Sequence, residues 1–267
     1  MTELLHAELT EAIIGVYYDV YNNLSQTYPE FVYENSMMVD LEQEKGISCV
    51  QQDEYEIWYK DRLVGRQQLD IFVAGEVVVE LKVAERIKRI HLAQLLSYLK
   101  TVGKEVGLLF RFGGPEPEFA RRVLTVEAWE KDIEVSSPEK LVGGEDLLHP
   151  DLVYDAVGGL LEIFKALGPG FIYRIYANAC HHEFRLRGLD VAPRKSVRVY
   201  YKGFDVGEIK FAHLQVADQM LVFPVAIRDI ADIRIENLKD WMRYRHIPLG
   251  ILANFYATWL EPVILRV

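Results

Sequence analysis

The chain has 267 residues, of which 50% are hydrophobic and 12% aromatic, a composition typical of a globular protein and not of a disordered one. Its formal net charge of -10 at pH 7 argues against a general nucleic-acid coat protein. No apolar run approaches the roughly 18 residues that a membrane span requires. The first residues carry acids where a signal peptide would carry bases, so we expect a cytoplasmic protein without a membrane partner.

The charge is unevenly distributed along the chain. Residues 1–149 carry 15 Lys and Arg against 27 Asp and Glu, whereas residues 150–267 carry 15 against 13. This asymmetry indicates a division of labour between an acidic and a mildly basic half. The two cysteines, Cys49 and Cys180, lie far apart and lack partner ligands at zinc spacing. We therefore expect neither a disulfide scaffold nor a structural zinc site.

Two helices are predicted at the start of the chain. Apolar residues recur at helical spacing over residues 3–24, and a second helix is expected over about 30–45, ending at Gly46. Glu30 falls in the first turn of this second helix, where the helix dipole favours a carboxylate. Glu30 is therefore either a helix-stabilising residue or an additional acid near a metal. Tyr33 is expected to pack, with its hydroxyl bonded to a group in the site.

Three strands forming a meander are predicted next, over about 48–59, 63–73 and 76–83. The first turn falls at Lys60-Asp61 and the second at Ala74-Gly75, both typical turn sequences. The last strand contains the apolar run Val77-Val78-Val79, which indicates a buried strand.

Charged residues follow this apolar run. Glu80 and Lys82 are two residues apart and point to one face of the strand, while Leu81 points away into the packing. A buried carboxylate and amine carry a large desolvation cost unless they are paired, and Asp70 on the neighbouring strand is a natural partner. Two carboxylates and an amine in reach of one another suit a hard divalent cation and an activated water. Taken alone, the pattern describes an ordinary charged strand end equally well.

A further helix is expected over 88–101. Gln94 and Tyr98 are four residues apart and therefore share one helix face. His91 is either a surface histidine of this helix or a secondary site residue. Residues 106–110 predict a buried strand that pairs parallel to its neighbour, because it is entered from a helix.

These motifs resemble those of a known enzyme superfamily. The order Asp70, then Glu80-x-Lys82, resembles the PD-(D/E)xK nuclease superfamily. Gln94 and Tyr98 resemble the QxxxY element of its RecB-like members, in which the glutamine sits beside the metal site. The combined pattern is far more specific than any one motif.

A second resemblance points to one family within this superfamily. The segment Glu30-Phe-Val-Tyr33 is similar to the ExxY part of the GxxExxY family, with Thr27 in place of the leading glycine. The resemblance covers most of residues 8–112. It implies binding of Mg²⁺ or Mn²⁺ by Asp70, Glu80, Glu30 and the carbonyl of Leu81. It also implies that Lys82 positions or activates the attacking water and that Gln94 completes the site.

The remainder of the chain repeats this pattern. Residues 113–148 are rich in Pro, Gly, Ser and charge, and are predicted to be a linker with added secondary structure. Beyond them the elements recur at an offset of 143 residues. The GxxExxY motif reappears with its glycine intact but with Tyr173 in place of the glutamate. We therefore expect one unit over 1–112 and a second over 149–267.

The second copy loses every candidate ligand. The positions equivalent to Asp70, Glu80, Lys82, Gln94 and Tyr98 hold His213, Phe223, Val225, Asn237 and Trp241. Phenylalanine and valine cannot bind Mg²⁺, so this unit is predicted to be inactive. A duplicated fold tends to reuse one self-complementary surface, so we expect the two units to pack as a pseudo-dimer. The oligomeric state is left open.

The expected fold is α/β, with two tandem PD-(D/E)xK-nuclease-like units, each a mixed central sheet flanked by helices. The main hypothesis is a metal-dependent nuclease or related phosphodiesterase acting on nucleic acid. In it, the second unit binds substrate or partner through Arg185, Arg187, Arg194, Lys195, Arg198 and Lys202, a stretch that otherwise describes a solvated hairpin face. The alternative is a non-catalytic, nuclease-fold binding or regulatory protein with a protein partner. No P-loop or other common catalytic motif supports an unrelated enzyme.

Overall fold

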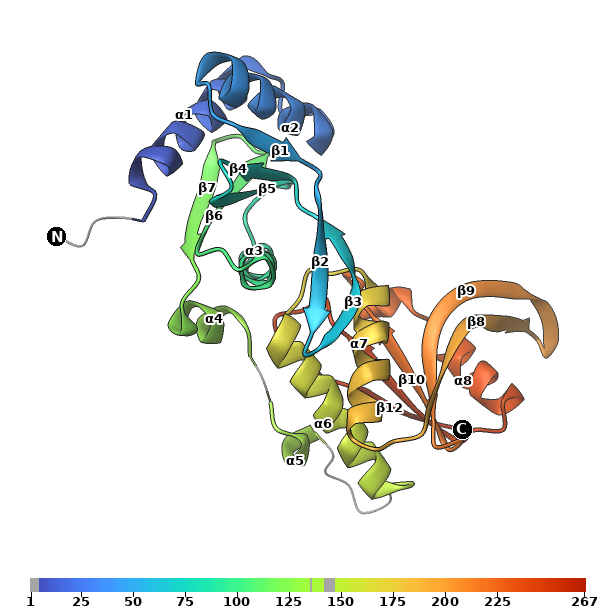
Figure 1. Cartoon of the computed structure of the whole chain (residues 1–267). Coiled ribbons are helices and arrows are strands. Elements are labelled where there is room, and N and C mark those ends of the chain that lie inside the picture. The colour runs from blue at the N-terminus through green and yellow to red at the C-terminus, as the bar shows by residue number, and fades with distance from the viewer. Residues whose placement is uncertain (1–4, 135, 142–146) are drawn as a thin grey trace. The chain divides into compact units, whose positions relative to one another are not determined.

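The computed structural model describes residues 5–134, 136–141 and 147–267 of the chain, which divides into two compact units (Figure 1). The first comprises Met1–Glu56 and Arg66–Asp132, and the second comprises Ile57–Gly65 and Ile133–Val267. Each is a mixed sheet flanked by helices, which confirms the predicted fold class. Among the described helices, none combines the length and the apolar character that crossing a membrane requires.

The first unit is built on a five-stranded sheet in the order β1-β4-β5-β6-β7. Its strands are β1 (Cys49–Gln51), β4 (Ile71–Val73), β5 (Val77–Val83), β6 (Val106–Phe112) and β7 (Glu118–Val123). The β5–β6 pair is parallel, as predicted for a strand entered from a helix, and the other pairs are antiparallel.

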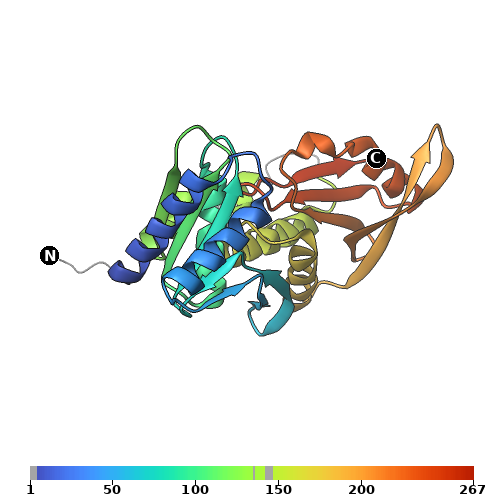
Figure 2. The same ribbon diagram turned by 90° about the horizontal axis from the view of Figure 1, so that it is seen from above.

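Helices cover both faces of this sheet. The helices α1 (Ala7–Asn23) and α2 (Glu30–Val39), with the π-helical turn η1 (Asp40–Glu44), lie along one face (Figure 2). Alternate residues of β5, including Leu81, enter the core beneath them. Helix α3 (Arg89–Val102) packs on the other face, where a Cβ on Gly107 would lie 2.7 Å from Leu95 Cδ1. Glycine at this position therefore lets the helix approach the sheet closely.

A two-stranded hairpin replaces part of the expected meander. Strands β2 (Glu54–Tyr59) and β3 (Arg62–Gln68) form a separate two-stranded sheet. Before them, Gln52 adopts a left-handed φ of 52°, and its amide donates to the Asp70 carbonyl at 3.0 Å. This conformation turns the chain out of the sheet after β1, and the chain returns at β4. The hairpin tip, residues 57–65, belongs to the second unit.

The stretch 113–148 was expected to be a linker with added secondary structure, and its described residues form one strand and two short helices. Strand β7 forms an edge of the first sheet. The helices are α4 (Val126–Asp132) and α5 (Pro138–Leu141). Residues 135 and 142–146 of this stretch lie outside the described residues.

The second unit repeats the topology of the first, with the sheet order β12-β11-β10-β9-β8. Its strands are β8 (Val191–Tyr201), β9 (Phe204–Val216), β10 (Met220–Val225), β11 (Leu249–Asn254) and β12 (Val263–Arg266). Its helices are α6 (Pro150–Leu167), α7 (Tyr173–Leu186), the 3-10 turn η2 (Ile230–Asp232) and α8 (Ile235–Tyr244). The β10–β11 pair is parallel, like β5–β6.

Individual contacts repeat at the same offset as the sequence. The Tyr33 hydroxyl donates to the Ser25 carbonyl at 2.7 Å, and the Tyr176 hydroxyl donates to the Gly168 carbonyl at 2.7 Å. Both members of the second pair lie 143 residues after their counterparts in the first. The Tyr33 hydroxyl also accepts from the Tyr28 amide, so it holds the loop before α2. Both partners of the Tyr33 hydroxyl thus lie in that loop, although a partner in the candidate site was expected.

Candidate metal centre

Asp70, Glu80 and Lys82 come together where β4 begins beside β5. The Asp70 carboxylate accepts a hydrogen bond from the Leu81 amide at 2.8 Å. The Lys82 ammonium donates to Glu80 Oε1 at 2.6 Å and to the Leu81 carbonyl at 2.8 Å. The sequence alternation places Glu80 and Lys82 on the face opposite Leu81, as predicted.

The position of Asp70 depends on a break between two strands. In the first unit, Leu69 and Asp70 separate β3 from β4, whereas β9 of the second unit runs without interruption through His213, the equivalent of Asp70. Outside the regular strand, Asp70 directs its side chain to the β5 backbone. The hairpin excursion of β2 and β3 therefore also shapes the site.

Glu80 is the most deeply buried carboxylate of this group, with 4% of its surface exposed. Burial raises the pKa of Glu80, against the opposing charge of Lys82. Its Oε2 atom is buried and has no hydrogen-bond partner among the described residues. A buried carboxylate oxygen without a partner carries a large desolvation cost. A cation at Oε2 would remove that cost, so this atom fits a metal ligand.

The electrostatics of Asp70 and Lys82 follow from the same burial. Burial, followed by the charge of Glu80, raises the pKa of Asp70 to about 8. Burial pulls the pKa of Lys82 down, but the charges of Glu80, Asp70 and Glu30 together outweigh it, and the net shift is upward. Lys82 is therefore an ammonium group at neutral pH, able to donate hydrogen bonds but not to accept a proton.

A second set of carboxylates adjoins Asp70. Ligand oxygens of Glu30, Glu34 and Asp70 all lie within 4.8 Å of one another. Glu30 accepts from the Val83 amide at 3.3 Å, and its Oε1 lies 3.9 Å from the Lys82 ammonium. The first turn of α2 thus brings Glu30 beside the candidate site.

Glu34 is a candidate residue that the sequence reasoning missed. It is buried, and its Oε2 accepts hydrogen bonds from Gln52 at 2.8 Å and from Gln51 at 3.1 Å. A signal was available, because Glu34 follows Glu30 by four residues and so shares its helix face.

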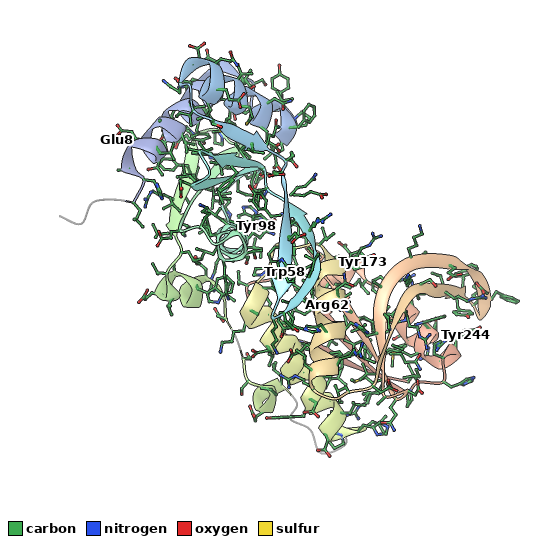
Figure 3. The ribbon with its side chains drawn as sticks, viewed as in Figure 1. Glu8, Trp58, Arg62, Tyr98, Tyr173 and Tyr244 are labelled. Atoms are coloured by element: carbon green, nitrogen blue, oxygen red, sulfur yellow. The ribbon has the colours of Figure 1, made fainter. Side chains whose placement is uncertain are left out.

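The residues predicted on α3 are less directly engaged. Gln94 is half-buried, and none of the hydrogen bonds in the described part of the chain joins it to Asp70 or Glu80. The Nδ1 atom of His91 accepts from the Lys88 amide at 3.3 Å, which caps the start of the helix. Tyr98 is buried on the same helix (Figure 3).

An aromatic cluster stands at the equivalent position of the second unit. The His213 ring stacks on Phe223 with centroids 5.4 Å apart, and Trp241 Nε1 donates to His213 Nε2 at 3.1 Å. Burial lowers the pKa of His213 to about 4, so its ring is neutral at physiological pH. Rings therefore stand where the first unit has Asp70 and Glu80.

A groove of about 870 Å³ lies beside this cluster, between α7 and the β8–β9 hairpin. Its lining includes the charged side chains of Arg174, Arg194, Lys195, Lys210 and Glu208, together with His181. Two of the six predicted basic residues, Arg194 and Lys195, thus line the groove.

The other predicted basic residues lie elsewhere in the second unit. Arg187 pairs with Glu183 at 2.9 Å, and Arg198 pairs with Asp205 at 2.6 Å. Arg185 and Lys202 are exposed, on α7 and at the hairpin turn. Of these four residues, two are therefore held in ion pairs and two are exposed.

Comparisons with known proteins place the chain in a family. It is similar to a solved structure titled "Crystal structure of SSO0001", at 16% identity and a TM-score of 0.31. That match covers 46% of this chain and 61% of the other. The search of curated proteins found no match. The family model of the PD-(D/E)XK nuclease superfamily matches residues 7–123 and again residues 150–267, so the chain belongs to this superfamily through both of its units.

Proposed function

We propose that the protein is a divalent-metal-dependent nuclease, or a related phosphodiesterase, acting on nucleic acid through the site in its first unit. The motifs around Glu30 and Gln94 favour the GxxExxY branch and its RecB-like relatives. The observation that carries the proposal is the buried Glu80 carboxylate. It is paired with Lys82 through one oxygen, and its other oxygen has no partner among the described residues.

The donor set fits a hard cation. Carboxylate and carbonyl oxygens are the ligands that Mg²⁺ and Mn²⁺ prefer. Asp70, Glu80 and the carbonyl of Leu81 would hold the ion, with Glu30 and Glu34 beside it. When bound, the ion would supply electrostatic stabilisation to the phosphate at which charge develops.

The chain's own residues would position the reactants. Lys82 remains protonated, so it would hold the attacking water or donate to a phosphate oxygen instead of removing a proton. Gln94 and Glu30 would complete the polar wall of the site.

The second unit would bind substrate without cleaving it. Its aromatic cluster offers no carboxylate at the positions of Asp70 and Glu80. Its groove combines four Lys and Arg side chains with Tyr173, a combination that suits a phosphate backbone and its bases.

Metal binding tests the proposal directly. In a calorimetric titration we expect the wild-type protein to bind Mn²⁺ and Asp70→Asn to bind it at least about tenfold more weakly, because one ligand charge is lost. Asparagine retains an acceptor for the Leu81 amide. Glu76→Gln is the matched control, since Glu76 pairs with Lys104 outside the site. Absence of binding to the wild type would favour the non-catalytic alternative, in which the fold binds a partner or regulates it.

The proposed role of the groove in binding nucleic acid can be tested separately. The double variant Arg194→Ala and Lys195→Ala is expected to weaken binding of a single-stranded oligonucleotide at least about tenfold at low salt. The slope of log affinity against log salt concentration is expected to decrease in magnitude by about 1–2. Fluorescence anisotropy over a range of salt concentrations measures both. Arg198→Ala is the control, because Arg198 shares the strand but pairs with Asp205. An equal loss in both variants would point to net charge and not to the groove.

A further inference from the structure

The tip of the β2–β3 hairpin is anchored on α7 within the second unit. The Tyr59 hydroxyl donates to Glu183 Oε2 at 2.8 Å, and Lys60 pairs with the same carboxylate. Asn178 Nδ2 donates to the Val64 carbonyl at 2.8 Å. Trp58 and Arg62 mark this hairpin in Figure 3. Glu183 and Asn178 of α7 therefore bind Tyr59, Lys60 and Val64 of the tip.

A glycine at the tip allows close approach. A Cβ on Gly65 would lie 2.6 Å from Ile175 Cγ1, nearer than real Cβ atoms come to another atom. Val64 and Tyr59 are also buried. The residues of this hairpin that contact α7 are thus Tyr59-Lys60 and, after three further residues, Val64-Gly65, which we call the contact sequence.

The same contact sequence recurs at the tip of the second hairpin. Tyr201-Lys202 and Val206-Gly207 have the same spacing and occupy equivalent places around the β8–β9 turn. Here the side chains are not covered, since Tyr201 is 63% exposed and Val206 is 58% exposed. Figures 1 and 2 show this hairpin projecting from the body of its own unit. The second tip therefore keeps the contact residues of the first without their contacts.

Helix α2 and Asp40, the first residue of η1 directly after it, carry the matching surface. At the offset of 143 residues, the positions of Glu183, Asn178 and Ile175 in α7 correspond to Asp40, Asn35 and Val32. The acid, the amide and the branched apolar residue are all retained in type. The Oδ1 atom of Asn35 accepts a hydrogen bond from Gln51. The Nδ2 group of Asn35 is equivalent to the group through which Asn178 donates to the Val64 carbonyl.

One contact changes type in a compatible way. The first hairpin pairs Asp61 with His182 at 2.8 Å. The equivalent positions hold Gly203 and Val39, and Val39 is 57% exposed. Phe204, next to Gly203, is 74% exposed. An apolar contact between Phe204 and Val39 would thus replace the hydrogen bond between Asp61 and His182.

We propose that the tip of the β8–β9 hairpin docks on α2 of a second copy of this chain. Lys202 then pairs with Asp40, as Lys60 does with Glu183. Gly207 lies close to Val32, as Gly65 does to Ile175. Because the two surfaces differ, the contact is head-to-tail and builds a ring or an open chain of copies. The proposal does not depend on catalytic activity.

Charge reversal tests this docking. Lys202→Asp and Asp40→Lys, each alone, are expected to weaken self-association at least about tenfold, because each places like charges opposite one another. An equimolar mixture of the two variants is expected to associate, since every hairpin then meets a helix of opposite charge. Sedimentation velocity on the full-length chains reads out the mass.

Matched variants exclude simpler explanations. Lys100→Glu reverses an exposed charge on α3, which packs on the other face of the first sheet from α2, and is expected to associate like the wild type. Circular dichroism shows whether each single variant is folded. A monomeric wild type, or a mixture that stays monomeric, would overturn the proposal. The latter result would also arise if the hairpin docked on α2 of its own chain.

Discussion

Lys82→Met is expected to slow metal-dependent phosphodiester cleavage about 10³-fold, the effect of removing one charged donor from a reacting centre. Methionine keeps most of the length of the side chain but cannot pair with Glu80, which Lys82 contacts at 2.6 Å. It also cannot orient water or stabilise charge on the phosphate. The measurement is a single-turnover rate at saturating Mn²⁺, on whichever single- or double-stranded DNA or RNA the wild type cleaves.

Two further variants isolate the cause of that loss. Glu80→Gln is expected to show a comparable loss in rate together with weaker Mn²⁺ binding, because it removes a ligand charge. Lys104→Met removes a lysine from a surface ion pair with Glu76 and is expected to cleave at the wild-type rate. Cleavage by Lys82→Met at the wild-type rate would exclude the proposed role of Lys82.

Mn²⁺ affinity is expected to rise with pH, about tenfold per unit between about pH 6 and 8, because binding displaces one proton. Burial and the charge of Glu80 raise the pKa of Asp70 to about 8, so its carboxyl is protonated below that pH in the metal-free protein. Calorimetry in buffers of different ionisation enthalpy counts the proton released. Asp70→Asn is expected to lose the dependence, and Glu76→Gln to retain it.

The same shift determines how the stability of the metal-free protein depends on pH. The folded-state pKa of Asp70 is above its ordinary value of 3.8, so between 3.8 and about 8 the folded chain binds more protons than the unfolded chain. This contribution to stability is therefore present at low pH and is lost as pH rises towards 8. Asp70→Asn is expected to raise the Tm at about pH 8 by several degrees. A variant no more stable than the wild type would contradict the burial of a charged Asp70.

Much of the fold and part of the candidate site could be predicted from local sequence patterns. Strand alternation places Leu81 in the core and Glu80 with Lys82 on the other face, and the helix before β6 predicts its parallel pairing. The offset of 143 residues predicted two similar units, which the two family matches and the repeated topology confirm. These features depend on neighbouring residues or on direct comparison of one half with the other.

Other features depend on which distant segments meet. The excursion of β2 and β3 out of the first sheet and the burial of Glu34 against Gln51 and Gln52 were not predicted. The spacing of Glu30 and Glu34 shows only that they share a helix face. Periodicity alone determined which face of each element is apolar, because it follows from backbone geometry. The tertiary structure decided which polar groups share the space between elements, because that depends on the free energy of packing and desolvation across the whole unit.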